Sequence, residues 1–120
     1  MTAAARSVQV FGWYIVVLGL TILLVPNILL GLFGLEPTAE PWIRVVGTIL
    51  IPLGAIYLVA AKSEATAVFR ITVWNRYWIL VAFVALWQFG IAPPQLIIFA
   101  IVDVAGATWT WVSLRKSAAS

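Results

Sequence analysis

Long apolar segments make up most of this chain and leave little sequence between them. Four stretches of about 20 largely apolar residues follow one another, the length that crosses the hydrocarbon core of a bilayer as an α-helix. We place them at 10–32, 42–61, 71–91 and 95–114. They are continuous apolar runs, without the alternation of apolar and polar side chains that marks barrel strands. The pattern therefore predicts an all-α protein, a bundle of four transmembrane helices in two helical hairpins, forming a single membrane domain over residues 1–120.

Pro26 interrupts the end of the first segment. A proline inside a helix removes one amide donor, and its ring clashes with the preceding turn. We therefore expect a kink or a loosened turn at Pro26 and Asn27. The segment is too long for the apolar region of a signal peptide, so we expect it to stay in the protein.

The basic residues favour one orientation of the helices. Cytoplasmic loops of membrane proteins carry an excess of Lys and Arg. Five basic residues share one side of the predicted membrane, namely Arg6, Lys62, Arg70, Arg115 and Lys116. On the other side, the loops at 33–41 and 92–94 carry only Glu36 and Glu40. We therefore expect both termini to be cytoplasmic.

The composition agrees with a membrane protein and excludes several kinds of chemistry. Hydrophobic residues make up 64% of the chain and charged residues 9%, whereas a soluble domain carries about 25% charged residues. Because the chain has no His and no Cys, we expect no metal site, no cofactor and no thiol nucleophile. The net charge is +3, but the seven Lys and Arg residues form no basic stripe, so we expect no nucleic-acid partner.

Asp103 is the acidic residue that the pattern places inside the membrane. It lies about 12 Å along the fourth segment from Gln95, at a rise of 1.5 Å per residue. A carboxylate at that depth is costly, so it should face the interior of the bundle and have a partner. Gly106, Ala107 and Thr110 share its helix face, and small residues there let another helix approach closely.

Two arginines are candidate partners for Asp103. Arg44 lies near the outer end of the second segment, and Arg76 lies inside the third. We prefer Arg44 slightly, although it can also pair with Glu40 at i−4. Such a buried charge site could bind a polar head group, an ion or a proton. It could equally be a structural ion pair that fixes helix register.

A second cluster lies at the start of the third segment. Arg70, Trp74 and Trp78 recur at i, i+4 and i+8 on one helix face. With Arg76 and Lys62, they could bind the head group of an anionic lipid at the cytoplasmic leaflet. A basic flank next to an ordinary aromatic belt explains the same residues, and it is the interpretation that we favour.

Glycines recur at a spacing of seven in the first two segments. Gly12 and Gly19 share one helix face, and so do Gly47 and Gly54. Small residues at this spacing support close helix packing, either inside one bundle or at a dimer face.

Five strings of the sequence carry a resemblance to known membrane proteins. PNILLGLFG, EPWIRVVG, PLGAIYLVAA, FRITVWNRYW and DVAGATWT together resemble small four-helix integral membrane proteins of bacteria, most of them uncharacterised. The layout is also similar to that of DoxX-like proteins, which are associated with redox or accessory roles. The resemblance implies a location in the bacterial cytoplasmic (inner) membrane. Small multidrug transporters share the length and helix number, but this chain has no equivalent of their first-helix Glu between Met1 and Leu35.

These observations predict a protein without enzymatic activity. Loops this short leave no room for a catalytic domain. We expect an accessory or scaffold subunit, or a binder of lipid or another hydrophobic ligand. Its partners would be membrane lipids and either further copies of the chain or a larger membrane complex. The alternative is a homo-oligomeric transporter or channel, with a charge-selective site formed by Asp103 and Arg44 or Arg76.

Overall fold

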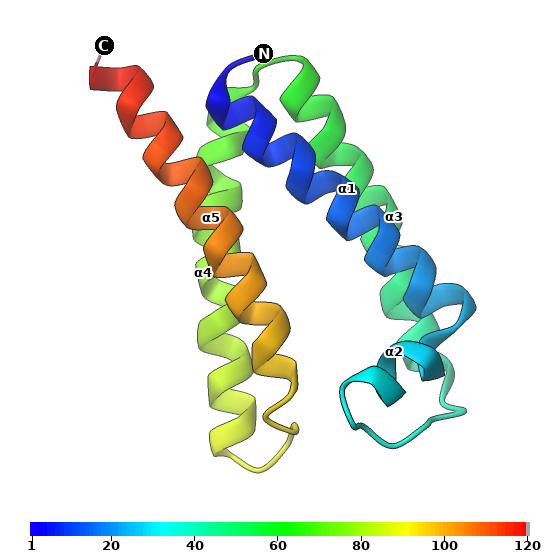
Figure 1. The fold of residues 1–120 in the computed structure, drawn as a ribbon. Coiled ribbons are helices and arrows are strands. Elements are labelled where there is room, and N and C mark those ends of the chain that lie inside the picture. The colour runs from blue at the N-terminus through cyan, green and yellow to red at the C-terminus, as the bar shows by residue number, and fades with distance from the viewer. Residues whose placement is uncertain (120) are drawn as a thin grey trace. The chain divides into compact units, whose positions relative to one another are not determined.

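The structure of the chain is a computed structural model that describes the backbone of residues 1–119 and the side chains of residues 1–116. Those residues form five α-helices and no β-strand. The helices are α1 (Ala3–Leu24), α2 (Pro26–Leu32), α3 (Pro41–Lys62), α4 (Thr66–Gln88) and α5 (Leu96–Ala119) (Figure 1). Four of them, α1, α3, α4 and α5, are long and apolar enough to cross a membrane. The predicted all-α class with four long apolar helices is confirmed.

Contacts within the chain gather into two compact units. The α1–α3 unit comprises Gln9–Val59 and holds most of α1, all of α2 and most of α3. The α4–α5 unit comprises Met1–Val8 together with Ala60–Ser120, and so includes the first turns of α1, the end of α3 and both C-terminal helices.

Glycines bring α1 and α3 into close contact in the α1–α3 unit. A Cβ atom on Gly47 would lie 2.7 Å from the carbonyl oxygen of Gly19 and 2.7 Å from the amide nitrogen of Leu23. A Cβ atom on Gly54 would lie 2.9 Å from the carbonyl oxygen of Gly12. Only small residues let two helix backbones approach this closely. The seven-residue glycine spacing therefore serves packing inside one antiparallel hairpin.

The first predicted segment, 10–32, proves to be two helices, so the prediction of one helix there is wrong. α1 ends at Leu24 and α2 begins at Pro26, with Val25 between them at φ −138° and ψ 58°. Pro26 has no amide hydrogen, and its ring occupies the space of the preceding turn, so α1 cannot continue through it. A proline fits well at the first position of a new helix, because the amide hydrogen there has no partner within the helix. The expected kink is a complete break.

α1 also begins earlier than predicted, at Ala3. Alanine is the strongest helix former, and three alanines follow Thr2. The hydroxyl oxygen of Thr2 accepts a hydrogen bond from the amide of Ala5 (3.1 Å), which caps the helix. A good cap thus extends the helix into a segment that looks too polar for a membrane span.

α4 and α5 pack as an antiparallel hairpin in the α4–α5 unit (Figure 1). The ring centroids of Trp74 and Trp111 are 6.4 Å apart, and the hydroxyl oxygens of Tyr77 and Thr108 are 2.7 Å apart. A higher residue number on α4 thus meets a lower one on α5. The connection between the helices turns at Gly90, whose φ of +72° favours glycine. These contacts define the register of the hairpin.

Candidate functional site

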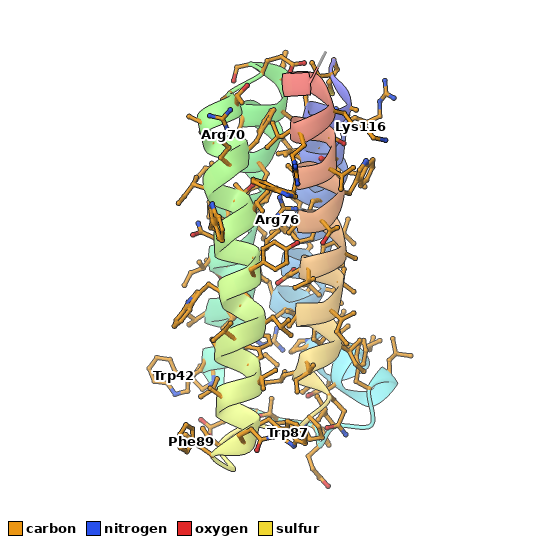
Figure 2. All side chains as sticks on the ribbon, turned by 90° about the vertical axis from the view of Figure 1, so that its left-hand side faces the viewer. Trp42, Arg70, Arg76, Trp87, Phe89 and Lys116 are labelled. Atoms are coloured by element: carbon orange, nitrogen blue, oxygen red, sulfur yellow. The ribbon has the colours of Figure 1, made fainter. Side chains whose placement is uncertain are left out.

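An arginine is buried in the middle of α4. Only 2% of the surface of Arg76 is exposed. Its Nε donates a hydrogen bond to the carbonyl oxygen of Thr72 (3.0 Å). Its Nη2 donates to the hydroxyl oxygens of Thr72 (3.1 Å) and Thr110 (3.2 Å). Figure 2 shows Arg76 between α4 and α5. The side chain therefore joins these two helices through hydrogen bonds.

Hydroxyl groups extend this cluster to the first turns of α1. Ser7 Oγ lies 2.7 Å from Thr110 Oγ1 and 2.7 Å from the carbonyl oxygen of Ala4. Thr110 Oγ1 also lies 3.1 Å from the carbonyl oxygen of Gly106. Ser7 and Thr110 have one hydroxyl hydrogen each, so two of these three contacts can be hydrogen bonds at any one time. The hydroxyl oxygen of Thr110 accepts the hydrogen bond from Arg76 Nη2.

We call Ser7, Thr72, Arg76 and Thr110 the arginine network. All four side chains are buried. A buried polar group costs free energy unless it finds a hydrogen-bond partner, and this cost is greatest in surroundings without water. The network thus favours one rotation and one register of α4, α5 and the start of α1.

Asp103 lies on the face of α5 that carries the network. Ala107 and Thr110, at i+4 and i+7, are fully buried, so the small-residue face predicted around Asp103 is a packed face. Asp103 itself is half-buried, and the positive charge of Arg76 acts favourably on its carboxylate. No hydrogen bond to that carboxylate is present among the described residues. The charge interaction of Asp103 in this unit is with Arg76.

Arg44 has a different role, inside the α1–α3 unit. Its Nη1 donates hydrogen bonds to the carbonyl oxygens of Leu23 and Leu24 (3.4 Å to Leu24). These carbonyls end α1, and the break at Pro26 leaves them without amide partners in a next turn. A cation is favourable at the negative end of a helix dipole. The guanidinium therefore caps α1, where the sequence suggested a pairing with Glu40 or Asp103.

The second predicted cluster lies on the exposed side of α4. Arg70 is exposed, and Trp74 and Trp78 are 64% and 63% exposed. Trp74 contacts Trp111 of α5 edge to face, at an interplanar angle of 61°. Arg76 is buried on another face, so it does not join this group. The structure extends the cluster across to α5.

Sequence reasoning missed three residues of these sites. Thr72 stands at i−4 from Arg76, the spacing at which a long side chain can fold back along its own helix, so it could have been found. Ser7 and Trp111 contact residues that are more than 30 positions away in the sequence, and no local sequence pattern predicts those contacts.

The described residues hold no group of three or more acidic, His or Cys side chains that could bind a metal ion. Comparisons of the chain with protein families, with curated proteins and with solved structures find no match.

Proposed function

We propose that this chain is an integral membrane protein that crosses the bacterial cytoplasmic membrane four times, with both termini in the cytoplasm, and acts as a non-catalytic accessory or scaffold subunit. The observation that supports this proposal best is the division of side chains in the structure. Large apolar side chains cover the exposed surface of the long helices, whereas the arginine network is buried.

The exposed apolar surface calls for a lipid or protein partner. Many large apolar side chains on α1, α3, α4 and α5 are more than half exposed, among them Val17, Ile49, Ile56, Val81 and Ile101. Soluble monomers rarely expose large contiguous apolar patches. Lipid chains, or the apolar helices of a partner subunit, satisfy such a surface without cost.

The use of the polar side chains favours a scaffold over an enzyme. Catalysis needs a nucleophile or a general base beside the site where a substrate binds. Here the hydroxyls of Ser7 and Thr110 contact each other, those of Thr72 and Thr110 contact Arg76, and all three contact helix carbonyls. This use of the hydroxyls in helix packing supports a scaffold role.

Transport is the second candidate, and Asp103 is the observation that favours it. A half-buried carboxylate inside an apolar helix, near a buried arginine, is the kind of group that proton and ion pathways use. Four helices leave little room for a pathway, so this function would require a homo-oligomer.

Two measurements separate the candidates. For the scaffold, the chain is extracted in a mild detergent after cross-linking in the membrane. We expect a complex of constant stoichiometry, built with another membrane protein or further copies of the chain. A chain that runs as a monomer with no bound partner would contradict the proposal.

For the transporter, the purified chain is reconstituted into liposomes that contain a pH-sensitive dye. We expect no proton flux above that of empty liposomes, for the wild type and for Asp103→Asn alike. If the wild type shows a flux and Asp103→Asn abolishes it, the scaffold proposal is wrong and the transporter is the better function.

A further inference from the structure

Two tryptophans and two arginines line one face of the α4–α5 hairpin. Trp74 of α4 contacts Trp111 of α5, with ring centroids 6.4 Å apart. Arg70 precedes Trp74 by four residues, and Arg115 follows Trp111 by four. Because the helices are antiparallel, both arginines lie one turn beyond the tryptophan pair, toward the same end of the hairpin.

This face is open at the surface. Trp74 is 64% and Trp111 is 38% exposed, and both arginines are exposed. The arginine network uses a different face, since Arg76 follows Trp74 by two residues and is buried. Figure 2 shows Arg70 near the start of α4, at the end of the hairpin that also carries Lys116. The four side chains can therefore meet a ligand from outside the hairpin.

The spacing of these residues matches a membrane interface. Indole rings prefer the boundary between lipid head groups and acyl chains. One helical turn, about 5.4 Å, separates that boundary from the level of the arginines. A guanidinium at the phosphate level can bind a phosphodiester with two parallel hydrogen bonds.

The charge around this face favours an anionic lipid over a zwitterionic one. The α4–α5 unit holds six of the seven basic residues, namely Arg6, Lys62, Arg70, Arg76, Arg115 and Lys116. Its two acidic residues are Asp103, which precedes Arg115 by 12 residues on α5, and Glu64. The Glu64 carboxylate already accepts hydrogen bonds from the amide (2.8 Å) and hydroxyl (2.7 Å) of Thr2.

We propose that Arg70, Trp74, Trp111 and Arg115 form a binding site for the head group of an anionic phospholipid of the leaflet at this end of the hairpin. The arginines bind the phosphodiester, and the tryptophan pair packs against the glycerol backbone and the first carbons of the acyl chains. Trp78, one turn deeper on the same face of α4, contacts the chains. This inference rests on the membrane location in the proposed function.

Native mass spectrometry of the detergent-purified chain tests the site. The chain is titrated with phosphatidylglycerol and, separately, with phosphatidylcholine. We expect the wild type to bind phosphatidylglycerol more tightly than phosphatidylcholine. The double variant Arg70→Gln/Arg115→Gln should bind phosphatidylglycerol roughly 30-fold more weakly than the wild type, because each basic residue near an anionic surface contributes about a fivefold gain in affinity. Both arginines are exposed, so circular dichroism should show an unchanged helix content.

The matched control is the double variant Arg6→Gln/Lys116→Gln. It removes the same charge near the same end of the hairpin, outside the proposed site. We expect it to keep most of the preference for phosphatidylglycerol. An equal loss in both double variants would show a general charge effect and overturn the site, as would equal binding of the two lipids by the wild type.

Extraction of membranes at alkaline pH separates this inference from the proposed function. If the chain leaves the membrane fraction, the proposal that it is an integral membrane protein is wrong. If the chain stays and the wild type shows no lipid preference, only the head-group site is wrong.

Discussion

Thr110 is the residue on which the arginine network converges. Its hydroxyl contacts Arg76, Ser7 and the carbonyl oxygen of Gly106. A hydroxyl is small and can donate and accept at the same time, so one side chain can serve three partners in a tightly packed place. Valine has nearly the same shape without the hydroxyl, which makes it a clean probe.

Thr110→Val should destabilise the helix packing of the α4–α5 unit. Hydrogen bonds between membrane helices contribute about 0.6 kcal/mol on average and about 1.7 kcal/mol at most, so we expect a loss within that range. Unfolding by denaturant in mixed micelles measures it. Thr110→Ser keeps the hydroxyl and should lose less. Equal losses for Val and Ser would mean that packing, not hydrogen bonding, is what matters there.

The close packing of α1 against α3 depends on the absence of a side chain at Gly47. An added methyl group would meet backbone atoms of α1, at 2.7 Å from both Gly19 O and Leu23 N. Backbone cannot move aside as a flexible side chain can, so the helices must separate. Overpacking of this kind costs about 1–3 kcal/mol.

We therefore expect Gly47→Ala to lower the free energy of unfolding by about 1–3 kcal/mol in the same assay. Gly31→Ala is the control, because nothing lies within 4 Å of its added Cβ. Alanine is the better helix former, so that variant should be neutral or gain about 0.5–1 kcal/mol. A neutral Gly47→Ala would refute the close packing of α1 and α3.

At the scale of helices, the end of α1 depends on a side chain from α3. Pro26 stops α1, and Arg44 supplies donors to the last carbonyl oxygens. Replacement of Arg44 by Gln removes the charge and should cost about 0.3–1 kcal/mol, the usual range for a cation at a helix C-terminus. Faster amide hydrogen exchange around residues 25–30 would report the loss. Arg6→Gln removes an exposed arginine elsewhere and should leave this exchange unchanged.

The start of α1 is connected to the α3–α4 turn by Glu64. Its hydrogen bonds with Thr2 lower the pKa of the Glu64 carboxyl below its ordinary value of 4.5. A carboxyl whose pKa is lower in the folded state stabilises the fold above its ordinary pKa, and this contribution disappears as the pH falls through the folded-state pKa.

We therefore expect the wild type to be more stable than Glu64→Gln at pH 7, and the difference to shrink and vanish as the pH falls below 4.5 and through the lowered pKa of Glu64. Thermal unfolding of both proteins across this range measures it. A difference that persists at low pH would show that the carboxylate charge is not responsible.

At the scale of the whole molecule, charge is sorted along the chain. Six basic residues belong to the α4–α5 unit, while Glu36 and Glu40 follow α2 in the α1–α3 unit. Basic loops stay in the cytoplasm. Alkaline phosphatase, which is active only outside the cytoplasm, should therefore be active when fused within residues 33–41 and inactive when fused after Lys116. Activity at the C-terminal fusion would reverse the proposed orientation.

Properties that depend only on neighbouring residues were predictable from the amino-acid sequence. The apolar length of each helix sets whether it can cross a membrane, so four long apolar helices were predictable. Pro26 stops a helix by its own ring and missing amide hydrogen, so a disturbance there was predictable, although not a full break. The seven-residue glycine spacing likewise predicted a close-packed helix face.

Which residues meet across helices became clear from the three-dimensional packing alone. The choice of Arg76 for the network, the capping of α1 by Arg44 and the pairing of Trp74 with Trp111 all depend on how each helix is rotated and in which register it packs. Rotation and register are determined by the sum of many contacts over the whole interface. A nearly uniform apolar sequence carries little local information about them, because several faces of each helix are equally apolar.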